Sequence, residues 1–252
     1  VLIPSQMFNA IDSVPLTAIA FFMLTGELMT SATITDRLVA LSRALIGRIR
    51  GGLAQVNVLV SMFFAGMNGS VVADTATVGA LVLPAMKKAG YPAAFSAAVT
   101  GVSSTIGGII PPSIMMIVLA NSTEISIAAL FAAGIIPGVL IGVVIMIINH
   151  YFAIKYNFER SDEPFSVRRA GKELYRFSFT LLIPLVLVGS VIGGVASVGE
   201  AGAITAMVAL LTGVFVYRTI KWKDCTGAFR RAFRNSAMVF IIIAASGPFS
   251  WL

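Results

Sequence analysis

The sequence predicts an all-α polytopic membrane protein. Of its 252 residues, 58% are hydrophobic and only 12% are charged, whereas a soluble domain is about half apolar and about a quarter charged. This composition excludes intrinsic disorder, which requires low hydrophobicity, and the single cysteine excludes a disulfide scaffold. At about 20 residues for each crossing, the chain has room for at most about eight to ten membrane spans.

The basic residues indicate how these spans are oriented. All 18 Lys and Arg residues fall in four clusters, which lie within residues 37–50, 87–88, 155–176 and 218–234. Two further polar breaks, 121–126 and 197–200, hold no basic residue. Because basic loops of membrane proteins stay in the cytoplasm, we expect the four clusters to be cytoplasmic and the two breaks to be external. The net charge of +7 therefore reflects topology, and nucleic-acid binding is not expected.

The apolar runs between these polar segments predict the spans in order, with crossings that alternate in direction. The predicted spans are residues 14–29 (inward), 93–119 (outward), 127–148 (inward), 177–196 (outward), 201–217 (inward) and 237–252 (outward). Residues 1–50 thus hold one span and an amphipathic connecting arm, which lies on the membrane surface. The arm has Leu38, Leu41, Leu45 and Ile49 on one face. Residues 151–176 form a cytoplasmic loop, and residues 177–252 form the further spans.

Residues 51–86 interrupt the alternation, because both of their flanks are basic. Two full spans and a turn need somewhat more than about 40 residues. The segment therefore predicts a re-entrant hairpin with half-helices at 53–65 and 73–83 and a tip at 66–70. Backbone at membrane depth is tolerated only where it is buried in protein or lines a cavity, which makes the tip a candidate site. Two short, tilted helices with a polar turn at the far surface are the alternative.

Residues 92–150 predict a broken helix followed by a return span. Glycines and prolines interrupt the helix near its middle, and three adjacent hydroxyl residues precede them. A broken helix frees carbonyl oxygens, and oxygen ligands suit a hard cation such as sodium. The alternative is a proline kink whose hydroxyls bond back to the helix. The candidate ion-binding residues are Ser103, Ser104, Thr105, Gly107, Gly108, Pro111 and Pro112.

Asp74 follows the predicted hairpin tip by a few residues. A carboxylate inside the membrane is a functional candidate by default, and it could bind a cation directly. An Asp near the start of a helix can instead cap it. Capping is slightly favoured, because a carboxylate at this position would repel any anion that binds near the tip. An intramembrane hydrolase that used Asp74 would need a second acid or a Ser/His partner, and no convincing one is found. The sequence therefore predicts no catalytic residue.

The hairpin and the broken helix resemble a known family. The segments that carry the likeness are residues 47–59, 69–79, 83–91, 103–107 and 111–113, with 21–29 in an earlier helix. They are similar to the large membrane (permease) subunits of TRAP transporters, the tripartite ATP-independent periplasmic transporters. The resemblance covers essentially the whole chain. The proline that the family commonly has before Glu200 is absent, which predicts a looser turn there.

The resemblance implies a sodium-coupled importer of the elevator type in the bacterial inner membrane. Its substrate would be an organic acid, such as a C4-dicarboxylate or sialic acid. Its partners would be a periplasmic substrate-binding protein and a small membrane subunit, with Na⁺ as coupling ion and no cofactor. The chain would hold the first inverted repeat and the start of the second, with both ends of a longer protein missing. A dicarboxylate or citrate carrier that works without a binding protein is the alternative within transport.

The predicted site joins the hairpin tip to the broken helix. The tip residues Asn68, Gly69 and Ser70 would meet residues 103–107, whose carbonyl and hydroxyl oxygens would hold sodium. Backbone amides near Asp74 and Thr75, at the start of the second half-helix, would favour a carboxylate on the substrate. Bound sodium would order the tip, so the substrate should bind better after the ion.

Overall fold

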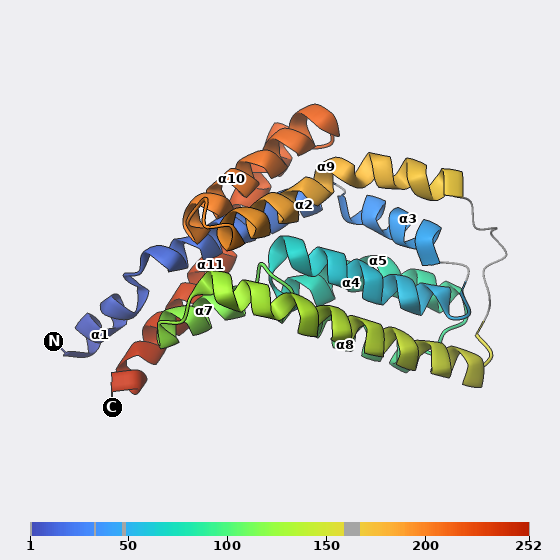
Figure 1. Cartoon of the computed structure of the whole chain (residues 1–252), viewed down its shortest axis with the longest axis horizontal. Coiled ribbons are helices and arrows are strands. Elements are labelled where there is room, and N and C mark those ends of the chain that lie inside the picture. Colours follow the sequence, from blue (N-terminus) through green and yellow to red (C-terminus); the bar gives the residue numbers. More distant parts are fainter. Residues whose placement is uncertain (1, 33, 47–48, 159–166, 252) are drawn as a thin grey trace.

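The structure is a computed structural model that describes residues 2–32, 34–46, 49–158 and 167–251. These residues form helices joined by turns, and no strand occurs among them (Figure 1). The helices are α1 (Leu2–Ile11), α2 (Thr17–Ser31), α3 (Ile34–Ile46), α4 (Gly52–Asn68), α5 (Val71–Lys88), α6 (Ala93–Ser104), α7 (Ile114–Thr123), α8 (Ile127–Lys155), α9 (Val167–Ile192), α10 (Val198–Leu211) and α11 (Trp222–Trp251). Short turns of 3-10 helix at Val14–Leu16 and Thr105–Gly108 and of π-helix at Thr212–Val216 complete them.

The helices form two groups. In the first group α2 packs against α10 and α11, and α11 also packs against α1. In the second group α4 lies at the centre and contacts α5, α6 and α8. Helix α3 packs against both α4 and α9, and α9 packs against α10, so α3 and α9 connect the two groups (Figure 1). The candidate site lies in the middle of the second group, where that group contacts α2.

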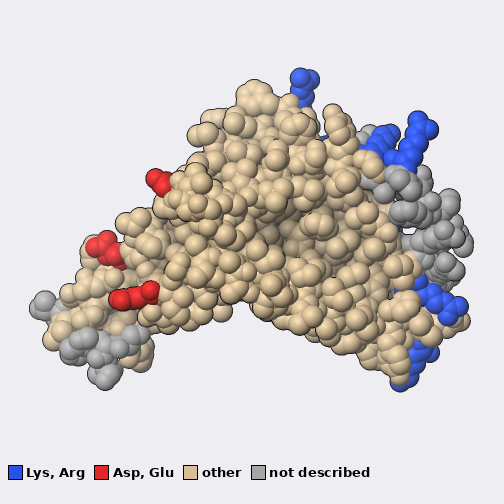
Figure 2. Space-filling view, in the orientation of Figure 1, with Lys and Arg blue, Asp and Glu red and all other residues tan. Residues whose placement is uncertain are grey.

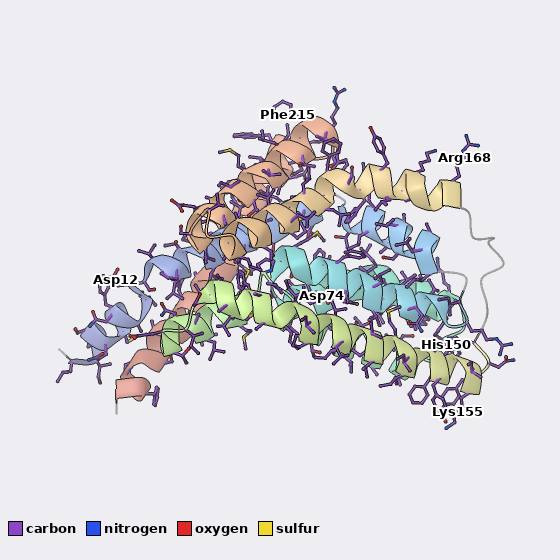
Figure 3. The ribbon with its side chains drawn as sticks, viewed as in Figure 1. Asp12, Asp74, His150, Lys155, Arg168 and Phe215 are labelled. Carbon is purple, nitrogen blue, oxygen red and sulfur yellow. The ribbon has the colours of Figure 1, made fainter. Side chains whose placement is uncertain are left out.

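The prediction of an all-α polytopic membrane protein is confirmed. Within the part of the chain that the structure describes, four helical segments are long and apolar enough to cross a membrane, namely Val14–Ser31, Ile127–Lys155, Val198–Val216 and Trp222–Phe249. On the face drawn in Figure 2, basic side chains gather at the right and upper edges and acidic ones at the left. Lys155 and Arg168 lie at one end of the molecule and Asp12 at the other (Figure 3). This separation of charge supports the orientation that the basic clusters predict.

The hairpin helices are longer than the sequence predicts. Helix α4 continues through Gly66 to Asn68, and α5 begins at Val71, so only Gly69 and Ser70 form the turn. Gly69 ends α4 because it adopts the left-handed conformation, with φ of 61°. Ser70 then caps α5, since its hydroxyl accepts a hydrogen bond from the Ala73 amide at 3.3 Å. The helices have 17 and 18 residues and are about 25–27 Å long, somewhat shorter than an apolar bilayer core of about 30 Å.

The helix is broken and not merely kinked. The other part of the alternative is confirmed, because the hydroxyls of Ser103, Ser104 and Thr105 bond back to carbonyls of α6. Helix α6 ends at Ser104, a 3-10 turn follows, and α7 begins only at Ile114. Ser113 starts α7 as its N-cap, because its hydroxyl accepts from the Met116 amide at 3.3 Å. The same hydroxyl donates to the Gly108 carbonyl at 2.8 Å. Residues 105–113, which we call the break, therefore have a defined path outside α-helix between two short helices.

Two further predictions need correction. The turn before α10 is not loose, because Ser197 and Glu200 form a capping box in which each side chain bonds to the other residue's backbone amide. The loop predicted at 151–176 is also shorter than expected. Helix α8 extends to Lys155 and α9 begins at Val167, while residues 159–166 lie outside the described residues.

The connecting arm is a helix, as predicted, but α3 ends at Ile46, before the predicted end at residue 50. Its apolar face is partly covered by protein. Leu38 and Leu41 are buried in the core that α3 shares with its neighbours, whereas Leu45 and Ile49 are exposed. The arm is therefore held by packing against α4 and α9, in addition to any contact with the membrane surface.

Helix α8 approaches the break and α4 through three glycines that lie about one helical turn apart. A Cβ atom on Gly134 would lie 2.5 Å from the Ile109 carbonyl oxygen, and one on Gly138 would overlap the Ile110 side chain. A Cβ atom on Gly142 would meet only the side chain of Met62. Gly134 and Gly138 thus give the break the space in which it lies against α8.

We expect Gly134→Ala to destabilise the protein by about 1–3 kcal/mol, the usual cost of overpacking. The cost is largest at this position because the neighbour is backbone that cannot rotate away. Gly142→Ala should cost less, since the Met62 side chain is flexible. Thermal unfolding of the purified protein measures both, with Gly189→Ala as the control because a Cβ there meets nothing within 4 Å. Equal unfolding temperatures for Gly134→Ala and Gly189→Ala would contradict the expectation.

Candidate functional site

The hairpin tip and the break are in direct contact. The Ile114 amide, at the start of α7, donates a hydrogen bond to the Gly69 carbonyl at 3.3 Å. A Cβ atom on Gly69 would lie only 2.5 Å from the Pro112 carbonyl oxygen, so the approach requires glycine. A Cβ atom on Gly107 would lie 3.7 Å from the Ser70 carbonyl, which places the 3-10 turn against the tip. The tip and the break therefore pack together closely.

The other predicted residues of the break surround this contact. A Cβ atom on Gly108 would lie 3.4 Å from a methyl group of Val71, the first residue of α5. Pro111 and Pro112 are buried, and the Pro111 carbonyl lies 3.7 Å from the Cβ position of Gly66. The glycines and prolines of the break act here by shaping the backbone, because none of them has a polar side chain.

A chain of buried polar side chains connects α4 to α6 beneath the tip. The Asn57 amide donates to the Thr100 hydroxyl at 2.7 Å. The Ser103 hydroxyl donates to the Thr100 carbonyl at 3.1 Å and lies 3.4 Å from the Asn57 side-chain oxygen. The hydroxyls of Ser61 and Ser103 lie 3.2 Å apart. Every one of these side chains is buried. The arrangement concentrates oxygen atoms in an otherwise apolar group of helices.

Three members of this chain, Asn57, Ser61 and Thr100, are not among the residues predicted from the sequence. A signal for them exists in the spacing of polar residues along the apolar helices. Asn57 and Ser61 are four residues apart on α4, and Thr100 and Ser104 are four apart on α6. Residues at this spacing share one face of a helix. A polar stripe on each of two apolar helices predicts that the stripes face each other.

Asp74 lies in the middle of the molecule, beside this polar chain (Figure 3). Its side chain is fully buried, and neither carboxylate oxygen has a hydrogen-bond partner among the described residues. The hydroxyls of Ser61 and Ser104 lie close enough to interact with its charge. The capping interpretation of Asp74 is therefore wrong, because Ser70 is the cap of α5.

The two helices whose side chains lie beside Asp74, α4 and α6, provide no compensating positive charge. Neither α4 nor α6, which pack against α5, contains a charged residue. Burying a carboxylate without a partner costs on the order of several kcal/mol, even after the protein relaxes. Among the described residues, no three or more His, Cys, Asp and Glu side chains lie together in a group that could bind a metal ion. One carboxylate among hydroxyl and amide oxygens fits a monovalent hard cation better than zinc.

The hydroxyls of Thr75 and Thr105 lie outside the buried chain. Both residues are exposed, and their hydroxyls donate to backbone carbonyls of their own helical turns, those of Val71 and Val102. The Ser104 hydroxyl also donates backward, to the Thr100 carbonyl at 2.8 Å. A hydroxyl that donates its hydrogen keeps its lone pairs, so Ser104 can still offer oxygen to a cation. Of the three predicted hydroxyl ligands, the structure brings Ser104 beside Asp74, and it places Ser103 one step away, next to Ser61.

A hairpin that meets a broken helix at the centre of an apolar helical bundle is typical of secondary transporters. The whole chain, residues 1–252, matches the family model described as "Tripartite ATP-independent periplasmic transporter, DctM component", and the chain belongs to this family. It is accordingly a multi-pass protein of the bacterial inner membrane.

Named relatives are similar to almost the whole of this chain. Identity is 33% to the sialic acid TRAP transporter large permease protein of Vibrio cholerae, over 98% of this chain and 58% of that protein. Identity is 34% to the C4-dicarboxylate TRAP transporter large permease protein of Pseudomonas aeruginosa, over 95% of this chain and 56% of that protein. Identity is 33% to the 2,3-diketo-L-gulonate TRAP transporter large permease protein of Escherichia coli, over 98% of this chain and 58% of that protein. The chain thus spans less than two thirds of the length of these relatives.

Proposed function

We propose that this chain takes part in the sodium-coupled import of an organic acid, of the C4-dicarboxylate or sialic acid type. The names of the relatives support transport of this substrate class. The observation that carries the proposal of sodium is Asp74, a buried carboxylate without a partner among the described residues, beside the Ser61 and Ser104 hydroxyls. The tripartite family supports two partners, a small membrane subunit and a periplasmic substrate-binding protein.

In this mechanism sodium binds where the tip meets the break. Its ligands are the Asp74 carboxylate, the Ser103 and Ser104 hydroxyls, and backbone carbonyls near Thr105 and Gly107. Sodium neutralises Asp74, which belongs to α5, and attracts the oxygens of α6 toward it. Ion binding therefore draws the tip onto the break, and this ordering raises the affinity for the substrate.

The substrate carboxylate then binds at the start of α5. The first amides of a helix have no carbonyl partner within the helix and carry partial positive charge. Val72, in the first turn of α5, has a largely exposed side chain, so this end of the helix is open to a ligand. Sodium bound nearby adds to the attraction for an anion. Movement of the loaded hairpin group past α2, α10 and α11 would carry both across the membrane in an elevator cycle.

The experiment that tests the ion site compares three alanine variants of the full-length transporter in proteoliposomes. Ser103→Ala and Ser104→Ala should each weaken apparent sodium affinity by about tenfold, the effect of losing one polar contact to a charged group. Thr105→Ala should have little effect, because its hydroxyl is exposed. Substrate affinity at saturating sodium should change less in all three variants.

Ser178→Ala provides the matched control. Its hydroxyl is bonded to a carbonyl of its own helix, like that of Ser104, but it lies on α9. Unchanged sodium dependence in both Ser103→Ala and Ser104→Ala would contradict the proposed site. Uptake that needs no binding protein would instead favour a carrier of the binding-protein-independent type.

A further inference from the structure

The hairpin tip also contacts α2, a helix of the other group. Gly26 is buried on α2 directly against the tip residue Asn68. A Cβ atom on Gly26 would lie 2.7 Å from the Asn68 Cβ and 3.3 Å from the Asn68 Cα. The first distance is shorter than real Cβ contacts, and the second involves backbone. Only glycine therefore allows α2 and the end of α4 to come this close.

Asn68 determines the shape of the turn that follows it. Its side-chain oxygen accepts a hydrogen bond from the Ser70 amide at 3.0 Å. The next residue, Gly69, is bonded through its carbonyl to the Ile114 amide. A displacement of Asn68 is thus passed on to both residues of the turn and to the break. Asn68 is only 3% exposed, and its amide nitrogen has no partner among the described residues, so packing rather than bonding of that nitrogen holds the side chain against α2.

The contact is fixed on the side of α2 by the residue next to Gly26. The Glu27 carboxylate forms an ion pair with the Arg231 guanidinium at 2.6 Å and accepts a hydrogen bond from the Asn235 amide at 3.2 Å. Both partners lie on α11. Helix α2 is thereby tied to α11 at the level at which it touches the tip, and it forms a firm surface for Asn68.

We propose that Gly26 is a positioning residue for the transport site: its missing side chain lets α2 hold Asn68 in place, which sets the geometry of the tip against the break. The proposal rests on the proposed function to the extent that the tip helps to form the ion site. The conformation of α2 itself does not need glycine, because alanine is the better residue in a helix. Any loss of tip order or sodium affinity in Gly26→Ala must therefore come from the contact with Asn68.

The first test measures the position of the tip without any reference to sodium. Met67 precedes Asn68 and is 2% exposed, so a cysteine there should react slowly with a membrane-permeant maleimide. In the full-length protein with Cys225→Ser and Met67→Cys, Gly26→Ala should raise the labelling rate by about tenfold. The control is Gly101→Ala on α6, where a Cβ meets nothing within 4 Å, and it should leave the rate unchanged. An unchanged rate in Gly26→Ala would overturn the proposal.

The second test asks whether Gly26 acts through Asn68. Gly26→Ala should weaken apparent sodium affinity by about tenfold in the wild-type background, as expected for overpacking. In an Asn68→Gly background the overlapping Cβ is gone and only the 3.3 Å approach to the backbone Cα remains, so Gly26→Ala should have a much smaller additional effect. Such non-additivity is the signature of two residues that act through one contact. Equal effects of Gly26→Ala in both backgrounds would overturn the proposal.

The two tests separate this proposal from the proposed function. Wild-type uptake without sodium dependence would refute sodium coupling, while the labelling experiment would still report whether Gly26 positions the tip. If Gly26→Ala cannot be purified in folded form, the double variant with Asn68→Gly should restore a monodisperse protein. Failure of that rescue would count against the contact as the cause.

Discussion

Replacing Gly69 with alanine is expected to reduce uptake by at least about a hundredfold. Two costs add at this position. The left-handed conformation, with φ of 61°, costs a residue with a side chain about 1–2 kcal/mol. The new Cβ would also lie 2.5 Å from the Pro112 carbonyl oxygen and 3.2 Å from the Ile114 nitrogen, and overpacking of this kind costs about 1–3 kcal/mol more. The tip would have to leave the break, which separates the two halves of the ion site.

Gly90→Ala is the matched control for this variant. Gly90 also has a positive φ, of 79°, but a Cβ there meets nothing within 4 Å. The Gly90→Ala variant should therefore show the effect of backbone strain alone, which is a modest loss of thermal stability with nearly normal uptake. Initial uptake rates and unfolding temperatures of both variants, in the full-length transporter, separate strain from overlap. Similar uptake by Gly69→Ala and Gly90→Ala would show that the contact with the break is unimportant.

Asp74→Asn is expected to abolish sodium-coupled uptake, with a loss of at least about a hundredfold, while the protein stays folded. Asparagine has nearly the same shape, so the packing of α5 against α4 and α6 is retained. The substitution removes the one negative charge that attracts sodium, and a buried charge interaction of this kind contributes about 3–5 kcal/mol when broken from one side. Direct sodium binding, sodium-dependent uptake and the unfolding temperature together test this expectation.

Two other variants distinguish the charge of Asp74 from the cap of α5. Ser70→Ala removes the cap and should cost about 1 kcal/mol of stability, with sodium binding retained in part. Glu124→Gln, at the exposed end of α7, changes the net charge equally and should have no effect. Sodium-coupled uptake by Asp74→Asn at the wild-type rate would eliminate the role of the charge.

The membrane class and the break could be predicted from the sequence because each depends on local chemistry. Apolar runs of span length and basic clusters act through their own contact with lipid and water. Two glycines and two prolines between residues 107 and 112 interrupt a helix wherever it is placed. The ends of the hairpin helices depend on more than local preference. Gly66 and Gly69 are the same residue type, but Gly66 lies within α4 and Gly69 ends it, bonded through its carbonyl to Ile114.

The sequence by itself thus determined a polytopic helical protein with a hairpin, a broken helix and a carboxylate between them. Only the tertiary structure decided the role of each polar residue. In the structure Ser70 caps α5, and the Asp74 carboxylate lies beside Ser104 without a hydrogen-bond partner among the described residues. The approach of Gly26 to Asn68 likewise joins helices that are far apart in sequence. The physical reason is that helical periodicity determines which face a residue lies on, whereas the neighbour of that face depends on how all the helices pack together.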